Sequence, residues 1–219
     1  MPRKRPQASA ARQPLAFALG TPAKVATLRA LAGAGEPITQ RDAARRAGVQ
    51  HRSVQLALDD LVQLAIVTRQ AGGRDYLVRL NDAHRLVPVL RALFRAEADH
   101  FLELRRCLAQ VASDVARRTG LVSVALFGSV ARARDLPSSD CDVLIVARDD
   151  GGLTRAMEAF EVCAVVLRES HGCRLAPIGY VRTDAARRWR ARAAPFNEIS
   201  RDALIVFGPP LAEALRDKA

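Results

Sequence analysis

Apolar residues recur every three or four positions in two stretches near the start of the chain, residues 25–32 and 54–64. This spacing places the apolar side chains on one side of an α-helix, so it predicts two amphipathic helices. Thr21 and Pro22 are residue types that begin helices, and they precede the first stretch. Between the two stretches, residues 40–47 predict a shorter helix that ends at a glycine.

The pattern changes to an alternation of apolar and polar residues at 66–70 and again at 75–80. Alternation is typical of strands with one buried face, and the glycine-containing segment 71–74 between them predicts a β-hairpin. The order of helix, short helix, tight turn, helix and hairpin over residues 21–80 resembles the winged helix-turn-helix domains of bacterial winged-helix repressors. The resemblance implies that the chain binds double-stranded DNA.

Candidate DNA contacts follow from this resemblance. In a winged helix-turn-helix domain the helix after the tight turn enters the major groove, and the hairpin lies along the backbone or the minor groove. The residues that the resemblance places at bases and phosphates are Arg45, Arg46, Gln50, His51, Arg52, Ser53, Gln55, Arg69 and Arg74. The alternative is a common small core of three helices and a hairpin, in which the exposed arginines only face solvent.

A long helical stretch is predicted over residues 81–120, with residues 81–84 as its cap and Pro88 in its first turn. Large apolar residues continue through it from 86 to 111, and they must be buried against another surface. The helix therefore packs on the second domain, forms a dimer interface, or does both. We expect a homodimer because winged-helix repressors usually read two half-sites. The alternative is an ordinary intramolecular helix.

An apolar, strand-forming run over residues 121–127 ends in a Gly-Ser pair, and an Asp-x-Asp motif ten residues later opens a second apolar run. This segment, LFGSVARARDLPSSDCDVLIV, resembles the signature of the minimal nucleotidyltransferases within the DNA polymerase β-like superfamily. The resemblance implies a mixed sheet flanked by helices, an NTP as substrate and Mg²⁺ as cofactor.

The residues of this signature suit the binding of a triphosphate. A glycine at 128 lets the backbone approach a phosphate closely, and the helix that follows offers free N–H groups at its N-terminus. Asp140 and Asp142 project from one face of a strand and are the expected catalytic residues and Mg²⁺ ligands. The expected nucleotide-binding residues are Gly128, Ser129, Arg132 and Ser139.

Two departures from the nucleotidyltransferase pattern bear on catalysis. The strand expected to carry a third carboxylate, residues 174–181, contains no acid, and Ala133 replaces the glycine usual in the family. One hypothesis is therefore a DNA-binding transcriptional regulator whose transferase domain binds Mg²⁺ and nucleotide in a degenerate site. The alternative is an active enzyme that transfers a nucleotidyl group from an NTP to a hydroxyl of a protein, an RNA or a small molecule.

Some minimal nucleotidyltransferases act in toxin-antitoxin pairs, so the resemblance also implies a small helical protein as a candidate partner. A neighbouring gene for such a protein would favour this arrangement. The absence of an acid from residues 174–181 favours the regulator over an active enzyme.

Composition and charge divide the 219-residue chain into modules. Basic residues outnumber acidic ones by 34 to 23, and the first 120 residues hold +10 of the net charge of +11. The basic N-terminal part is suited to bind a polyanion such as DNA, whereas the nearly neutral C-terminal part is expected to have a different function.

From these patterns we expect an α+β protein with two domains. Its expected parts are a flexible basic arm at 1–20, a winged helix-turn-helix domain at 21–80, a helical linker or dimerisation segment at 81–120 and a nucleotidyltransferase-fold domain at 121–219.

Two further classes of protein are disfavoured. No apolar run approaches the roughly 18 residues that a membrane span needs, and the basic N-terminus lacks the apolar stretch of a signal peptide, so a cytoplasmic location is expected. The four cysteines form no CxxC pair, and no histidine falls at ligand spacing. Disulfide or metal chemistry at cysteine is therefore not expected.

Overall fold

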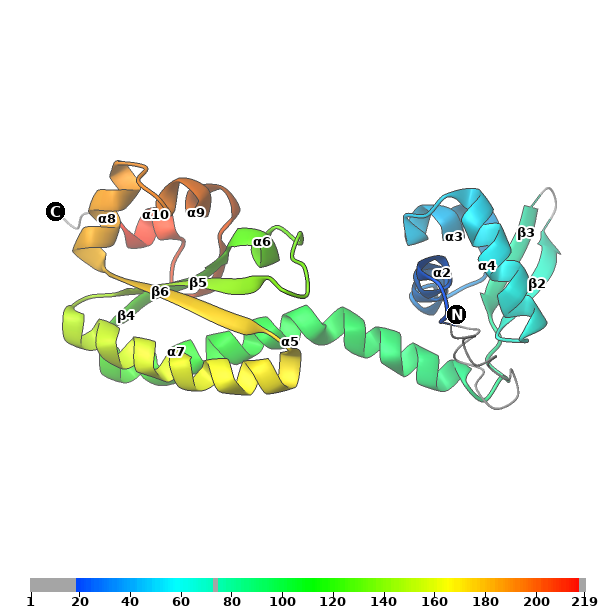
Figure 1. Ribbon diagram of the computed structural model, residues 1–219, viewed down its shortest axis with the longest axis horizontal. Helices are drawn as coiled ribbons and strands as arrows, with labels where there is room; N and C mark the ends of the chain where they lie inside the picture. Colours follow the sequence, from blue (N-terminus) through cyan, green and yellow to red (C-terminus); the bar gives the residue numbers. More distant parts are fainter. Residues whose placement is uncertain (1–18, 73–74, 217–219) are drawn as a thin grey trace, which may run out of the picture. The chain divides into compact units, whose positions relative to one another are not determined.

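The computed structural model describes residues 19–72 and 75–216. Most of the arm expected at residues 1–20, and the candidate DNA contact Arg74, lie outside the described residues. The chain divides into two compact units, Met1–Ala98 and Asp99–Ala219 (Figure 1).

The first unit combines three short helices with a small antiparallel sheet (Figure 1). Its elements in chain order are α2 (Pro22–Ala32), β1 (Ile38–Thr39), α3 (Gln40–Ala47), α4 (His51–Gln63), β2 (Val67–Gly72) and β3 (Asp75–Leu80). The strand order is β1-β3-β2, and both pairings are antiparallel. This is the predicted winged helix-turn-helix arrangement. Only β1 was missing from the prediction, because two residues are too few to show an alternation.

The predicted helix ends of this unit are confirmed. The side chain of Thr21 accepts a hydrogen bond from the backbone N–H of Lys24 at 3.3 Å, and that of Thr39 accepts one from Asp42 at 3.1 Å. Gly48 has a φ of 63°, a left-handed conformation that glycine adopts at little cost, and it ends α3 just before α4. The core that the helices close on the sheet includes Leu28, Leu31, Val54, Leu58, Leu61, Ile66, Val78 and Leu80.

Helix α5 (Val87–Thr119) contributes to the cores of both units. It begins later than predicted, because residues 81–84 form a turn rather than a cap and the Nδ1 atom of His84 accepts a hydrogen bond from the backbone N–H of Leu86. The buried positions of α5 are Val87, Leu90 and Phe94 in the first core and Leu104, Leu108 and Ala112 in the second. Intramolecular packing therefore accounts for these apolar positions, and a dimer seam stays a prediction.

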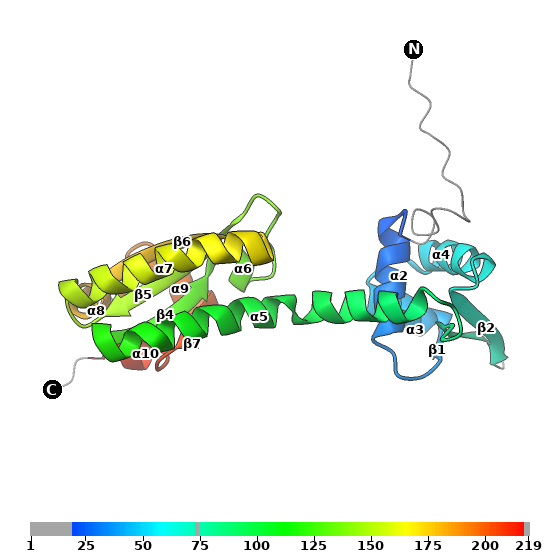
Figure 2. The ribbon, with the colours of Figure 1, turned by 90° about the horizontal axis from the view of Figure 1, so that it is seen from below.

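The second unit is built on a four-stranded mixed sheet (Figure 2). Its elements after α5 are β4 (Leu121–Phe127), α6 (Gly128–Ala131), β5 (Asp140–Ala147), α7 (Asp150–His171), β6 (Arg174–Val181), α8 (Arg182–Arg190), α9 (Phe196–Asp202), β7 (Leu204–Phe207) and α10 (Leu211–Ala214). The strand order is β6-β5-β4-β7, with β5 parallel to β6 and β4 antiparallel to β5 and β7. The predicted α+β class with a mixed sheet is thus confirmed.

Helices cover both faces of this sheet (Figure 1). On one face α7 and the second part of α5 bury a core that includes Leu108, Leu126, Val143, Ile145 and Phe160. On the other face α8, α9 and α10 bury a core that includes Phe127, Leu144, Val146, Ile199 and Leu211. Successive residues of β5 therefore point to opposite faces of the sheet. This alternation decides on which face the side chains of its first three residues, Asp140, Cys141 and Asp142, lie.

A membrane span is not seen: within residues 19–72 and 75–216, no helix combines the length and the apolar character that crossing a bilayer requires.

Candidate functional site

The predicted Gly-Ser turn and the second carboxylate of the Asp-x-Asp motif lie in contact. Phe127, the last residue of β4, pairs in register with Asp142 on β5. Gly128 follows with a φ of +74°, and a Cβ atom built on it would lie 2.1 Å from the Oδ2 atom of Asp142. Only glycine fits here, because any side chain would strain the backbone and overlap the carboxylate.

Asp140 and Asp142 share the face of β5 that is covered by α9, while Cys141 between them points to the opposite face. Burial is the main cause that raises the pKa of Asp142 above its usual range. The charge of Asp140 raises it further, Arg132 lowers it, and the charge of Glu198 also raises it. Two carboxylates are therefore held close enough to repel each other, as in a site built to receive a cation.

Arg174 occupies the place next to Asp140 on the strand where a third carboxylate was expected. The two residues pair in register across the parallel strands β5 and β6, and Ala176 pairs with Asp142. The Nε atom of Arg174 lies 2.9 Å from the Oδ1 atom of Asp140. The strand that follows α7 therefore contributes a positive charge to this site instead of a negative one.

Acidic side chains approach the site from α9 instead. Arg132, the residue that ends α6, places its Nη1 atom 3.0 Å from the Oδ2 atom of Asp202 and 4.0 Å from the Oε2 atom of Glu198. These contacts turn the guanidinium of Arg132 toward α9. The sequence shows both acids, but it gives no spacing signal that would place them beside residues some 60 to 70 positions earlier in the chain.

The two candidate serines lie in different surroundings. Ser129 is half-buried in α6, beside Gly128. The hydroxyl of Ser139 accepts a hydrogen bond from the backbone N–H of Leu136 at 2.9 Å, which closes the loop before β5. Ser139 also lines a cavity with Cys141, on the sheet face away from Asp142. The structure therefore places Ser129 next to Gly128, which approaches Asp142, and commits Ser139 to the loop.

The helix expected after the Gly-Ser pair is a single turn. α6 spans only Gly128–Ala131, so it offers free backbone N–H groups but little of the dipole of a long helix. Ala133 then takes a φ of +52°, the left-handed conformation for which the glycine usual in the family is suited. A left-handed alanine costs about 1–2 kcal/mol relative to an ordinary conformation.

This strain gives a prediction about stability. We expect Ala133→Gly to raise the free energy of unfolding by about 0.5–1 kcal/mol, because relief of the strain outweighs the extra freedom of glycine in the unfolded chain. Urea unfolding followed by the fluorescence of Trp189, the chain's single tryptophan, reports on this unit. Ala131→Gly in the helical turn should instead lower stability by up to about 1 kcal/mol. A loss of stability in both variants would contradict the claim that the backbone is strained at Ala133.

The raised pKa of Asp142 gives a second prediction. A carboxyl whose pKa is higher in the folded than in the unfolded chain contributes most to stability when protonated, and this contribution is lost as the pH rises through its folded pKa. We expect Asp142→Asn to increase the urea midpoint at pH 7, with a gain that shrinks as the pH falls toward the ordinary value of 3.8. Glu158→Gln, an exposed charge removal on α7, should leave the midpoint unchanged. Destabilisation by Asp142→Asn at pH 7 would be the contrary result.

The side chains present suit one Mg²⁺ ion that arrives with phosphates. Among the described residues, no three His, Cys, Asp or Glu side chains are grouped so that they hold a metal ion by themselves. However, Mg²⁺ usually takes one or two protein carboxylates and completes its shell with substrate phosphates and water. Asp140 and Asp142 meet that requirement once the partly exposed ion pair with Arg174 opens. Such exposed ion pairs contribute only about 0–1 kcal/mol to stability, so a divalent ion can displace Arg174 from Asp140.

The predicted DNA contacts gather at the start of α4 and along β2. His51 and Arg52 are exposed in the first turn of α4, and Gln50 precedes it. A shallow pocket brings Arg52 together with Gln55 and Arg69.

The arginines among these candidates differ in how they are held. Arg69 lies against Asp59 at 2.5 Å and over the ring of Tyr76 at 5.6 Å, so its guanidinium is fixed in the wing. Arg45 pairs with Asp42 at 2.5 Å on the surface of α3. Both Arg46 and Arg52 are exposed, whereas Ser53 is half-buried.

The fold and the two sites define a winged-helix domain followed by a domain of the nucleotidyltransferase fold. Comparison with protein families agrees: residues 21–75 match the MarR family, and residues 108–188 match the nucleotidyltransferase domain. The chain therefore carries a MarR-type DNA-binding domain and a nucleotidyltransferase domain.

Comparisons with whole proteins add little. No curated protein matches the chain. Among solved structures, human N-acetylserotonin methyltransferase in complex with SAM matches at 15% identity with a TM-score of 0.27. The match covers 78% of this chain and 46% of that one, so the chain spans less than half of that protein's length. A likeness at this level carries no argument about fold or function.

Proposed function

We propose that this chain is a transcriptional regulator that binds duplex DNA as a homodimer and carries a degenerate nucleotidyltransferase domain that binds Mg²⁺ and nucleotide. The ion pair between Arg174 and Asp140 carries the proposal, because it places a cation where an active transferase needs a third carboxylate. The contact between Gly128 and Asp142 supports retention of the nucleotide pocket.

Each residue has a definite role in nucleotide binding. The turn at Gly128 brings backbone N–H groups to the phosphates, and the hydroxyl of Ser129 adds a further donor. Asp140 and Asp142 hold the Mg²⁺ that accompanies the nucleotide, and this ion offsets the phosphate charge. Arg132 leaves its contacts with α9 to meet a phosphate oxygen. Because β6 supplies no third carboxylate to act as a base or a metal ligand, an attacking hydroxyl is not activated from that strand.

A transfer assay tests the proposal. The native chain and an Asp140→Ala/Asp142→Ala double variant are incubated with Mg²⁺ and either ATP or CTP labelled at the α-phosphate, together with total cellular RNA and protein. We expect incorporation at background level in both, while only the native chain retains labelled nucleotide on a filter. If the native chain incorporates label and the double variant does not, the site is not degenerate and the chain is an active nucleotidyltransferase.

The active transferase is a second candidate because of α9. Glu198 contributes to the raised pKa of Asp142, after burial and Asp140, so an acid outside β6 already faces the site. If Glu198 supplied the missing carboxylate, the chain would transfer a nucleotidyl group to a protein, RNA or small-molecule hydroxyl, with a small helical protein as its toxin-antitoxin partner. Glu198→Gln would then abolish the incorporation.

The role given to Arg174 leads to a further prediction. We expect Arg174→Ala to tighten the binding of Mg²⁺-ATP by about two- to fivefold. In this variant Asp140 has no ion pair with Arg174 that must break before the carboxylate can bind the metal. Arg168→Ala, an exposed charge removal on α7, should leave the affinity unchanged. Isothermal titration calorimetry with both variants measures this, and weaker binding by Arg174→Ala would show that the arginine contacts the nucleotide itself.

A further inference from the structure

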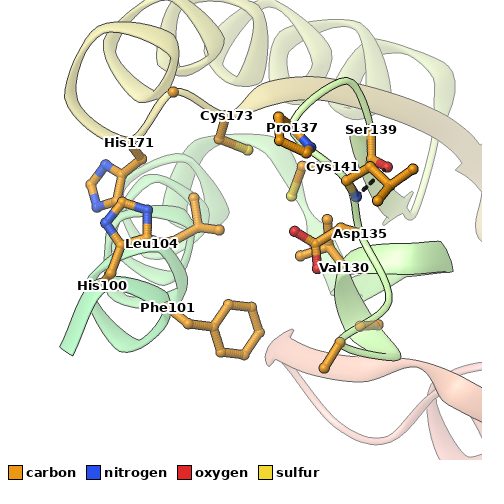
Figure 3. Close-up of a pocket in the computed structure, with 14 residues that line it drawn as sticks. His100, Phe101, Leu104, Val130, Asp135, Pro137, Ser139, Cys141, His171 and Cys173 are labelled. Carbon is orange, nitrogen blue, oxygen red and sulfur yellow. Dashed lines mark hydrogen bonds between the residues drawn. The ribbon is translucent and has the colours of Figure 1, made fainter. Parts of the chain in front are cut away.

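A cavity of about 660 Å³ lies in the second unit, on the sheet face covered by α5 and α7 (Figure 3). Its volume falls within the range of about 300–1,000 Å³ that is usual for small-molecule sites. It is lined by α5, by α6 and the loop to β5, and by the junction of α7 with β6. Because Asp140 and Asp142 point to the other face of the sheet, this cavity is separate from the nucleotide site.

The walls of the cavity are mainly apolar. Phe101 and Leu104 of α5 form one side, and Val130 and Pro137 form the other (Figure 3). Leu136, which also lines the cavity, is 68% exposed. The site therefore suits a ligand with a sizeable apolar or aromatic body.

The lining of the cavity lacks the basic side chains that are common elsewhere in this chain. Among the described residues that line it, Asp135 is the only one with a formal charge at neutral pH, and none is an arginine or a lysine. The remaining polar side chains are His100, His171, Ser139, Cys141 and Cys173. In a chain with a net charge of +11, the single fixed charge in the lining of this cavity is therefore negative.

The carboxylate of Asp135 lies across this space from two histidines. Figure 3 shows it on one side of the cavity, with the rings of His100 and His171 on the other, 5.0 Å apart between centroids. A positively charged group that enters between them therefore meets one carboxylate and no arginine or lysine of the lining.

We propose that this cavity binds a small aromatic or lipophilic organic cation, such as a protonated arylalkylamine, with Asp135 as its counter-ion. The apolar walls receive the body of the ligand, and the face of Phe101 is available to the cationic group. An anion would face Asp135 without an arginine or a lysine in the lining. The inference does not depend on nucleotide binding: of the residues expected for that function only Ser139 lines the cavity, and the proposal gives it no role.

Three probes with the same aromatic body and different charge test the proposal: 1-naphthylmethylamine, 1-naphthylmethanol and 1-naphthoate. Isothermal titration calorimetry with the full chain should show sub-millimolar binding of the amine, about tenfold weaker binding of the neutral alcohol, and no binding of the carboxylate. Binding of the alcohol or the carboxylate as tight as that of the amine would overturn the proposal, and so would the absence of amine binding.

Two variants locate the binding. Asp135→Asn keeps the shape of the side chain and should weaken amine binding about tenfold while leaving the alcohol unaffected. Glu158→Gln removes an exposed charge from α7 outside the cavity and should change neither affinity. Equal amine affinity in Asp135→Asn and the native chain would exclude Asp135 as the counter-ion.

The thiol of Cys173 offers an independent readout. Cys173 is half-buried in the wall of the cavity, so a bound ligand covers its thiol. We expect 1-naphthylmethylamine to slow alkylation of Cys173 by iodoacetamide severalfold, as measured by peptide mass spectrometry, without slowing that of Cys107. Equal protection of both cysteines, or of neither, would contradict occupation of the cavity.

Discussion

Gly128→Ala is expected to reduce the affinity for Mg²⁺-ATP by at least about 100-fold, or roughly 3 kcal/mol. A Cβ atom at this position would lie 2.1 Å from the Oδ2 atom of Asp142, and the φ of +74° is unfavourable for alanine. The carboxylate must therefore move out of the site, or the turn must open. Either change separates the turn proposed to bind phosphate from the carboxylate proposed to bind Mg²⁺. Isothermal titration calorimetry measures the loss.

A matched control separates the clash from the backbone strain. Gly172, which ends α7, has a similar φ of +62°, but nothing lies within 4 Å of a Cβ atom built on it. Gly172→Ala should therefore lower stability by about 1–2 kcal/mol and leave nucleotide affinity unchanged. If Gly128→Ala folds and binds nucleotide as the native chain does, the turn and Asp142 do not form one site.

Arg52→Ala is expected to weaken duplex binding by about 10- to 100-fold, since a contact of an arginine with a base or a phosphate in the major groove contributes roughly 1–3 kcal/mol. Arg52 is exposed in the first turn of α4, the part of a recognition helix that enters the groove. The affinity of the native chain should fall steeply with salt concentration, because phosphate contacts release counterions. Fluorescence anisotropy with labelled genomic fragments, titrated at several salt concentrations, measures both effects.

Arg95→Ala is the control for this experiment, because it removes the same charge from α5 instead of from the recognition helix. We expect its affinity to stay within about twofold of the native value. Similar losses in Arg52→Ala and Arg95→Ala would mean that net charge, rather than the predicted interface, determines binding. Binding that does not depend on salt would contradict the interface as a whole.

Local features of the molecule could be predicted from the sequence. Thr21, Thr39 and Gly48 mark the ends of their helices because caps and left-handed glycines act through hydrogen bonds within a few residues. The approach of Gly128 to Asp142 was also predictable, because it follows from two strands joined by a short connection. In each case the residues that interact are close in the chain.

Contacts that depend on distant pairing could not be predicted in the same way. Arg174 meets Asp140 only because β6 pairs with β5 in one particular register, and a shift of one residue would turn the arginine to the other face. The approach of Glu198 to the site depends on the packing of α9, which has no periodic signal in seven residues. Ser139 matches the motif in spacing, but a local hydrogen bond with Leu136 commits its hydroxyl to the loop.

The proposed function requires that Gly128, Ser129 and the two carboxylates of β5 form a pocket for nucleotide and Mg²⁺. Isothermal titration calorimetry of ATP and CTP, with Mg²⁺ and with EDTA, on the native chain and the Asp140→Ala/Asp142→Ala variant tests it most directly. We predict binding by the native chain that requires Mg²⁺ and is lost in the double variant. Equal binding by both chains, or binding by the native chain that persists in EDTA, would contradict the account.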